Sequence, residues 1–365
     1  MEAQQTASPL ASLPEQTNGA EAPARYGRWK RAIGLLVALS AKGHQALRRL
    51  RWRVLTRPSE GTIARVKLHK QKQHSSGRHY KEAPRASVIV QSFNQVKNIA
   101  FLESRLRATC MGELIVCEDG SVDGSLDEWL RRLTHPNDFL IRSNDLHEIR
   151  TYTRAVDFTR GEIICLMQDD DRPPKDGRWL SEALQFFELY PRLAVLGGWM
   201  GFMNYFAEEY NSPWLLPDRS SIPFTEPQTG RAFMFVENVN IGPYLLRKSA
   251  YMNLGGFDLM FSKPGSPGIC FESELCYRAW ERGYQVGLTD LPVKGPIDGG
   301  YLLPGGTMLW AKEERDHNDA VNKQRIAQLH GKHLPTVQAK VKHANQLLRC
   351  RPGRTDRAGA QPVPN

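Results

Sequence analysis

The stretch from Arg160 to Pro174, RGEIICLMQDDDRPP, joins an apolar run to three consecutive aspartates. The run Gly161 to Leu166 is rich in β-branched and apolar residues, which predicts a buried strand, and the prolines end it. Three neighbouring like charges repel one another, and each loses hydration where its surroundings are dry. The triplet is therefore either a solvated acidic turn or a site for a hard cation, which prefers oxygen ligands.

Strands and helices alternate along the chain on both sides of this stretch. Hydrophobic spacing predicts strands at 87–93, 113–121, 138–143 and 162–168, and helices at 96–108, 125–133, 148–158 and 178–190. Elements of this length in strict alternation are typical of a parallel, doubly wound α/β sheet with helices on both faces.

The polar segments of this region fall where the predicted strands end. Gln91 to Asn94 close the first strand, Glu118 to Ser121 close the second, and the aspartate triplet closes the fourth. Ligands of doubly wound sheets bind outside the carboxyl ends of the strands. This convergence favours a binding site over a solvated turn.

Two common motifs are excluded. Residues 119–124 match the opening of a calcium-binding EF-hand loop, but its twelfth position is Leu130 where a bidentate Glu is required. Neither Gly-x-Gly-x-x-Gly nor a Walker loop follows any predicted strand. A nucleotide would therefore be held chiefly by a cation and side chains.

The formal net charge of +10 is unevenly spread over the 365 residues. Between Arg25 and Lys81 the chain has sixteen Lys or Arg and a single acid, Glu60, so the remainder is net acidic. A nucleic-acid-binding core is therefore not expected. The six cysteines show neither a Cys-x-x-Cys pair nor a zinc spacing.

The N-terminal region divides into two parts. Residues 1–24 lack an apolar period, which predicts disorder. Residues 25–84 form a basic arm whose apolar run, 32–41, is about half the roughly 20 residues that a spanning helix needs. Residues 25–58 can form a basic amphipathic helix on an anionic membrane surface, or a helix that packs on its own domain. Localisation stays open between peripheral membrane, including Golgi or endomembrane, and cytoplasm.

Five blocks in order, SVIVQSFN, ELIVCEDGSVDGS, RGEIICLMQDDDRPP, LRKSAYMNLGGFD and CFESELCYRAWERGYQV, resemble glycosyltransferase family 2. The resemblance covers roughly Arg85 to Leu288 and implies a GT-A domain over 85–330. Residues 331–365 lie outside the resemblance and are expected to hold a C-terminal helix, which begins near 326 and ends near 348, and a disordered tail. It also implies a nucleotide-diphosphate sugar donor, with a UDP-sugar as first choice. A divalent cation, Mn²⁺ or Mg²⁺, and transfer with inversion follow from the same resemblance.

The donor-side residues implied by the resemblance lie after three strands. Asp119 takes the family's base-binding position, and Phe93 can cover the nucleobase. Gln91 stands where the family often has Pro or Thr. The family's Asp-x-Asp falls on Gln168 and Asp170, so Asp170 is the expected metal ligand, flanked by Asp169 and Asp171.

The acceptor-side assignments also come from the resemblance. The family's Glu-Asp pair falls on Phe271 and Glu272, so Glu272 takes the position of the catalytic base and Glu274 is the fallback. An ordinary exposed helix start is the alternative for this pair. Arg150 could neutralise the diphosphate and His317 could contact the metal, and surface charge is the alternative for His317.

Three functional classes remain. The first is an active inverting glycosyltransferase whose acceptor, a glycan, lipid or protein, the sequence does not name. The second is a degenerate relative that binds a nucleotide sugar or glycan without turnover. The third is a sugar-1-phosphate nucleotidyltransferase, which would need a phosphate loop after the first strand that QSFNQ does not provide.

Overall fold

The computed structural model describes residues 84–144, 146–198, 200–203, 222, 224–263, 265–293, 311–350 and 355–356. The predictions for residues 1–24, for the basic arm up to residue 83 and for most of the C-terminal tail lie outside these ranges. Within the described ranges, no helix combines the length and apolar character needed to cross a membrane.

The core is an eight-stranded sheet with the strand order β3-β2-β1-β4-β10-β5-β11-β8. Its strands are β1 (Ala86–Ser92), β2 (Glu113–Glu118), β3 (Asp138–Arg142), β4 (Ile163–Gln168), β5 (Leu193–Gly197), β8 (Phe233–Phe235), β10 (Tyr244–Arg247) and β11 (Gln285–Thr289). Two short pairs lie apart from it: β6 (Gly201–Phe202) with β9 (Asn238–Val239), and β7 (Phe224–Thr225) with β12 (Thr355–Asp356).

Six strands of the large sheet run parallel, and β10 and β8 run antiparallel to their neighbours. Residues of β1, β2 and β5 are buried along their whole length, as expected for strands covered on both faces. This mixed, mostly parallel sheet confirms the predicted α/β class with a mostly parallel, doubly wound sheet.

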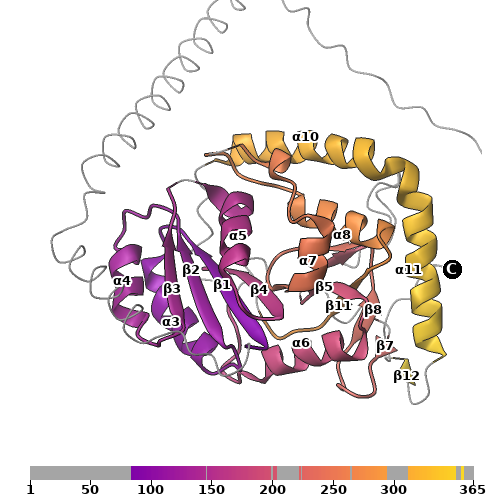
Figure 1. Ribbon diagram of the computed structural model, residues 1–365, viewed down its shortest axis with the longest axis horizontal. Coiled ribbons are helices and arrows are strands. Elements are labelled where there is room, and N and C mark those ends of the chain that lie inside the picture. The colour runs from indigo at the N-terminus through magenta and orange to yellow at the C-terminus, as the bar shows by residue number, and fades with distance from the viewer. Residues whose placement is uncertain are drawn as a thin grey trace, which may run out of the picture. The chain divides into compact units, whose positions relative to one another are not determined.

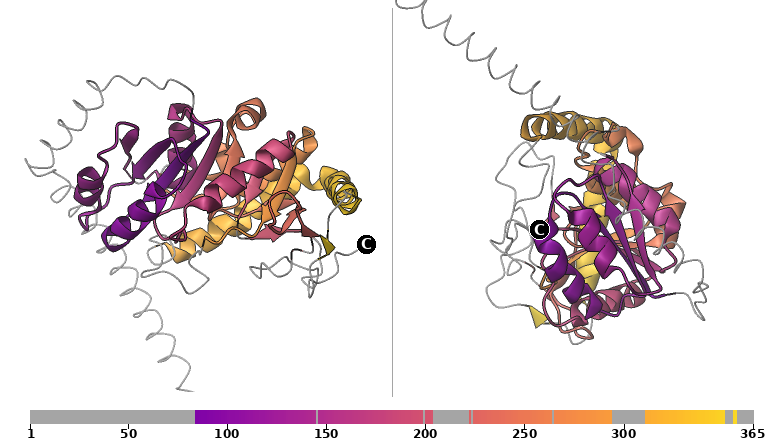
Figure 2. Two further views of the ribbon diagram at one scale, coloured as in Figure 1. Left: turned by 90° about the horizontal axis from the view of Figure 1, so that it is seen from below. Right: turned by 90° about the vertical axis from the view of Figure 1, so that its left-hand side faces the viewer.

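Helices lie on both faces of the sheet (Figures 1 and 2). They are α3 (Val96–Arg107), α4 (Ser125–Arg132), α5 (His147–Phe158), α6 (Arg178–Leu189), α7 (Lys248–Leu254), α8 (Phe271–Glu281), α10 (Lys312–His330) and α11 (Leu334–Arg349). The 3₁₀ turns η2 (Leu259–Phe261) and η4 (Gly331–His333) complete the set of described helical elements. The first four helices and the first four strands lie where the hydrophobic spacing predicts them.

The C-terminal region differs from the prediction of one helix near 326–348. It forms two helices, α10 and α11, which meet at η4 and run beside α8 (Figure 1). Lys340 Nζ donates to the Trp280 carbonyl at 2.7 Å, and the Asn345 side chain exchanges two hydrogen bonds with the Phe235 backbone. Both helices are therefore part of the same packed body as the sheet.

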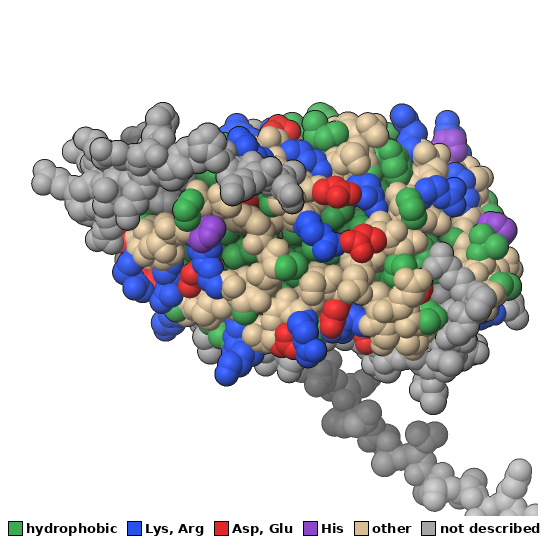
Figure 3. All heavy atoms as spheres, turned by 60° about the horizontal axis from the view of Figure 1, so that its bottom comes forward, with side chains coloured by type: hydrophobic (Ala, Val, Ile, Leu, Met, Phe, Trp, Pro, Cys, Tyr) green, Lys and Arg blue, Asp and Glu red, His purple; other side chains and the backbone are tan. Residues whose placement is uncertain are grey.

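Charged side chains are mixed on the molecular surface. On the face shown in Figure 3, Lys and Arg alternate with Asp and Glu, and hydrophobic side chains occur singly or in small groups. A protein that binds nucleic acid through its backbone phosphates gathers basic residues on one face instead. Figure 3 shows one face only, so the expectation that the core does not bind nucleic acid stays a prediction.

Gly161, which precedes β4, should not tolerate a side chain. A Cβ atom there would lie 2.6 Å from the Ser87 backbone nitrogen, and the Gly161 amide already donates to Ser87 Oγ at 2.8 Å. We expect Gly161→Ala to lower the free energy of unfolding by roughly 1–3 kcal/mol, the usual cost of overpacking. Urea unfolding followed by circular dichroism measures this, with Gly331→Ala as the control, because no atom lies within 4 Å of a Cβ there. Equal losses in both variants would contradict the packing explanation.

Candidate active site

The carboxyl ends of four parallel strands meet at one edge of the sheet. Gln91 of β1 pairs with Gln168 of β4, and Ser92 pairs with Glu118 of β2. Glu118 in turn pairs with Arg142 of β3. The polar segments that follow these strands are consequently neighbours in space, as the sequence predicts.

The segments after β1 and β2 are held together by reciprocal hydrogen bonds. The Asn94 amide donates to Ser121 Oγ at 2.9 Å, and the Val122 amide donates to Asn94 Oδ1 at 2.8 Å. Asp123 accepts from the Val96 amide at the first turn of α3. The DGSVDGS motif thus builds a rigid double loop, in which the Asp123 carboxylate is occupied by the backbone rather than left for calcium.

Asp119, the expected base-binding residue, is buried within this double loop. Its Oδ1 accepts from Ser143 Oγ and from the Leu146 amide, and its Oδ2 accepts from the His147 amide, each at 2.9 Å. His147 begins α5 with a positive φ of 56°, so the carboxylate stabilises an otherwise unfavourable helix start. The structure therefore gives Asp119 a helix-capping role, and its contact with a nucleobase stays a prediction.

The aspartate triplet follows β4 as a tight, buried turn. Asp169 Oδ2 accepts from the Phe93 amide at 2.7 Å, and Asp171 Oδ2 accepts from the Gln168 amide at 2.9 Å. Asp170 lies between them and is 4% exposed. Burial, followed by the charge of Asp170, raises the pKa of both Asp169 and Asp171 well above the ordinary value for aspartate. The solvated-turn interpretation is therefore wrong.

The chemistry of the triplet fits a divalent cation that is held partly by these carboxylates and partly by substrate phosphates. No donor among the described residues reaches Oδ1 of Asp171, although that atom is buried. A cation would supply the missing partner and offset the repulsion that raises the carboxyl pKa values. The described ranges contain no group of three or more His, Cys, Asp or Glu arranged as a complete metal site. One or two carboxylates supplemented by substrate phosphates are common for magnesium-type ions.

The start of α8 contacts the same end of the sheet. Tyr244 pairs with Leu166 across β10 and β4, and its hydroxyl donates to the Glu272 carbonyl oxygen at 3.2 Å. The ring of Phe271 lies 6.4 Å from that of Tyr152, centroid to centroid. The Tyr152 hydroxyl donates to the Met167 carbonyl at 3.1 Å, just before the triplet. These contacts join the start of α8 to β4, the strand that precedes the triplet.

The Glu272 carboxyl group has the environment of a general base. Its exposed fraction is intermediate, and its Oε2 is buried without a hydrogen-bond partner among the described residues. Burial raises the pKa of Glu272 to about 7, against the opposing effect of Arg315. A base with a pKa near the working pH is the efficient kind.

Glu274, the fallback base, is committed to ion pairs. It bonds both Nε and Nη2 of Arg278, and its Oε1 lies 3.4 Å from His330 Nε2. Burial alone would raise the pKa of Glu274, but the bonds to His330 and Arg278 outweigh it and lower the pKa. The His330 ring also approaches Glu281, with Nδ1 at 2.8 Å from its Oε1. Glu274 therefore joins α8 to the end of α10.

The remaining predicted residues lie at different distances from this site. Gln91 and Phe93 stand at the end of β1, where the Phe93 side chain is partly exposed. Arg150 is directed away from the triplet, because its guanidinium donates to the Ser262 carbonyl at 2.9 Å. His317 is exposed on α10. The roles of Arg150 at the diphosphate and of His317 at the metal stay predictions.

Two residues of α5 were missed by the sequence reasoning. Tyr152 connects the triplet with Phe271, as described above, and Glu148 lies one helical turn before it on the same face. Glu148 is 7% exposed, and its Oε2 has no hydrogen-bond partner among the described residues. In the sequence, Glu148 is indistinguishable from an acid that favours a helix N-terminus.

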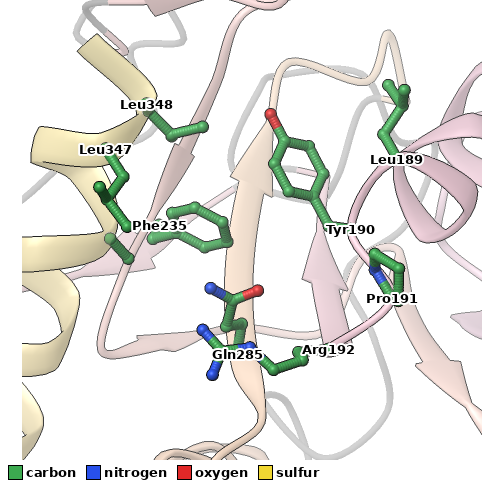
Figure 4. Close-up of a pocket in the computed structure, with 9 residues that line it drawn as sticks. Leu189, Tyr190, Pro191, Arg192, Phe235, Gln285, Leu347 and Leu348 are labelled. Carbon is green, nitrogen blue, oxygen red and sulfur yellow. The ribbon is translucent and has the colours of Figure 1, made fainter. Parts of the chain in front are cut away.

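A pocket of about 220 Å³ lies elsewhere, at the amino ends of β5 and β11 (Figure 4). Tyr190, Arg192, Phe235 and Gln285 line it together with α11 leucines. Because β5 and β11 run parallel to β4, this pocket opens at the opposite edge of the sheet from the triplet. It therefore takes no part in the site around Glu272.

A family model described as Glycosyl transferase family 2 matches residues 87–251, a range that includes the triplet but ends before Glu272. No curated protein matches the sequence.

Solved structures align with the chain at low identity. Mannosyltransferase PcManGT from Pyrobaculum calidifontis, in complex with GDP-Man and Mn²⁺, is 16% identical, with 66% of this chain and 69% of that chain covered and a TM-score of 0.40. S. aureus TarS 1-349 in complex with UDP is 17% identical, with 56% and 57% covered and a TM-score of 0.40. The same fragment with UDP-GlcNAc is 15% identical, with 56% and 55% covered and a TM-score of 0.41. The chain thus spans little more than half of the TarS fragment.

Proposed function

We propose that this chain, whose residues 87–251 match a family model described as Glycosyl transferase family 2, is a glycosyltransferase that transfers a sugar from a nucleotide-diphosphate donor to an acceptor hydroxyl, with inversion. The observation that supports this proposal is that two acidic segments lie toward the same end of the sheet. The buried triplet follows β4, and Glu272 lies in the first turn of α8, where its backbone carbonyl accepts from Tyr244, the partner of Leu166 in β4.

Glu272 is proposed as the general base. It accepts the proton of the acceptor hydroxyl while that oxygen attacks the anomeric carbon and the bond to the diphosphate breaks. Inversion follows when the base and the leaving group lie on opposite faces of the sugar. No side chain among the described residues bonds the Glu272 carboxylate, and its Oε2 is unpaired, which supports a role as an acceptor of the substrate's proton.

The triplet is proposed to hold the donor diphosphate through a divalent cation, Mn²⁺ or Mg²⁺. Asp170, flanked by Asp169 and Asp171, would bind the ion, and the ion would neutralise charge on the leaving diphosphate. Phe93 and Gln91, at the end of the neighbouring strand, are proposed to contact the nucleoside. UDP-sugars are the first donors to examine.

A nucleotide-release screen tests this function. The full-length protein is incubated with UDP-, GDP- and dTDP-sugars and Mn²⁺ or Mg²⁺, and the released nucleoside diphosphate is measured with Glu272→Gln as the matched control. Release that depends on both the cation and Glu272 supports the proposal. Tight donor binding without release would identify the degenerate, binding-only relative instead.

The transfer rate should rise with pH through about 7. Glu272 accepts a proton only when ionised, and burial raises its pKa to about 7. Below that pH the carboxyl group is protonated and transfer is slow, whereas above it the rate reaches a plateau. We expect a sigmoidal rise in kcat at saturating donor, measured from pH 5 to pH 9. A profile that is flat across neutral pH would contradict the assignment of the base.

The acceptor and the location of the enzyme remain proposals. A glycan, lipid or protein hydroxyl would each suit a carboxylate base. The basic segment 25–58, which lies outside the described residues, is proposed to bind an anionic membrane surface, which would place the enzyme at a cytoplasmic or endomembrane face.

A further inference from the structure

The first turn of α5 packs directly against the segment that leads into α8. The Arg150 guanidinium donates to the Ser262 carbonyl, and a Cβ atom at Gly268 would lie 2.5 Å from the Ile149 side chain. One turn farther along α5, Tyr152 meets Phe271. We refer to this contact between α5 and residues 262–272 as the α5–α8 seam.

Two acidic side chains lie along this seam, one from each side. Glu148 comes from α5 and precedes Tyr152 by one turn, and Glu272 directly follows Phe271. Each has a buried Oε2 without a hydrogen-bond partner among the described residues. Buried polar atoms are nearly always paired in folded proteins, so two unpaired carboxylate oxygens at one seam require an explanation.

Glu148 does not have the contacts of a structural glutamate. Glu274, two residues beyond Glu272, bonds Arg278 and approaches His330. Glu148 is only 7% exposed, and its Oε2 has no hydrogen-bond partner among the described residues. A buried, unpaired carboxylate costs folding free energy, and such groups gather at functional sites.

We propose that Glu148 is a positioning residue that acts through Glu272, as the second carboxylate of a pair spanning the α5–α8 seam. The proposal rests on the proposed function, in which Glu272 is the base. Two carboxylates in one poorly hydrated region cannot both ionise as readily as either would alone. Glu148 would thereby set the pH at which Glu272 becomes able to accept the acceptor's proton.

The charged groups around Glu272 determine whether a given substitution should raise or lower its pKa. The charges of Glu148 and, from α10, Asp319 raise its pKa, and the charge of Arg315 from α10 lowers it. From β10, the Tyr244 hydroxyl is directed at the Glu272 backbone. Neighbouring titratable groups on or next to α8 are Cys270, Glu274 and Cys276. Removing Glu148 should therefore act opposite in sign to removing Arg315.

Carbon-13 NMR of the full-length protein labelled at glutamate carboxyl carbons tests the pair without any turnover. The signal that disappears in Glu272→Gln is assigned to Glu272 and followed against pH. In Glu148→Gln its titration midpoint should shift to lower pH by about half a unit to one unit, the scale of a single nearby charge. In Arg315→Gln the midpoint should shift upward, and in Glu103→Gln, on α3 and paired with Arg107, it should not move.

An unchanged Glu272 midpoint in Glu148→Gln would overturn the proposal, as would an equal shift in Glu103→Gln. Should Glu148→Gln not fold, Glu148→Asp carries the test, because it withdraws the charge by one methylene and should give a smaller downward shift. With an active enzyme, the pH profile of kcat should move with the NMR midpoint, raising the rate at pH 6 about three- to sixfold. Absence of turnover would contradict the proposed function, while the titration would still decide the pair.

Discussion

The Glu272→Gln variant should transfer sugar about 10²–10⁴-fold more slowly than the wild type, the usual contribution of a positioned general base. The amide keeps nearly the same shape but cannot accept the proton of the acceptor hydroxyl. Donor affinity should stay close to the wild-type value, since Glu272 lies at the start of α8 rather than in the triplet. The measurements are kcat at saturating donor and the Kd of the nucleoside diphosphate.

Glu274→Gln is the matched comparison for this prediction. It neutralises the neighbouring acid on the same helix, and its expected effect is on stability, because Glu274 pairs with Arg278 and His330. Glu272→Asp should keep part of the activity, since a carboxylate remains one methylene farther away. Normal turnover by Glu272→Gln together with a dead Glu274→Gln would show that the base lies two residues later.

The second large effect is expected on nucleoside-diphosphate binding when the proposed metal site is altered. Asp170→Ala should abolish the cation-dependent part of nucleoside-diphosphate binding, because it removes the central carboxylate of the triplet. Isothermal titration of UDP or GDP, with Mn²⁺ and with EDTA, measures this part directly. Wild-type affinity that is undiminished in EDTA would refute a metal-dependent donor site.

Substitution of two further aspartates distinguishes an effect on metal binding from an effect on folding. Asp169→Ala should weaken binding less, but it should also destabilise the protein, because it leaves the buried Phe93 amide without its acceptor. Asp176→Ala, in the exposed loop after the triplet, removes a carboxylate that pairs with Arg178 and should leave donor binding unchanged. Thermal unfolding of each variant checks that affinity was measured on folded protein.

Much of the fold followed from local patterns in the sequence. The first four strands and helices lie where period-2 and period-3.6 spacing place them, because each is long enough to show its period. The antiparallel β10 and β8 were not predicted. They have four and three residues, so their apolar letters do not reveal a direction, and their places in the sheet depend on pairing with β4, β5 and β11.

The break between α10 and α11 was also not predicted, because the local sequence does not reveal it. The 3₁₀ turn at Gly331–His333 interrupts an otherwise continuous helical pattern, and α11 then continues with Pro335 in its first turn. Proline is well tolerated in the first turn of a helix. Neither Gly331 nor Pro335 by itself therefore marks the end of one helix and the start of another. The two helices take their course from contacts with α8 and β8.

Sequence alone determined which residues stand at the ends of parallel strands. Parallel strands bring their carboxyl ends to one edge whatever their side chains do, so the triplet, Asp119 and Gln91 had to be neighbours. That much is a property of the chain's order and spacing.

Only the tertiary structure decided what each side chain contacts there. The Asp119 carboxylate accepts a hydrogen bond from the amide of His147 at the start of α5. Glu274 is paired with Arg278 and His330. Glu272 has a buried Oε2 without a hydrogen-bond partner among the described residues. Residues two apart on a helix point to different sides, so Glu272 and Glu274 enter different surroundings. α5, which carries Glu148, meets the start of α8 through Tyr152 and Phe271, which are more than a hundred residues apart in the chain. Partners at such separations are set by packing, because burial and charge depend on which elements meet and not on their spacing in sequence.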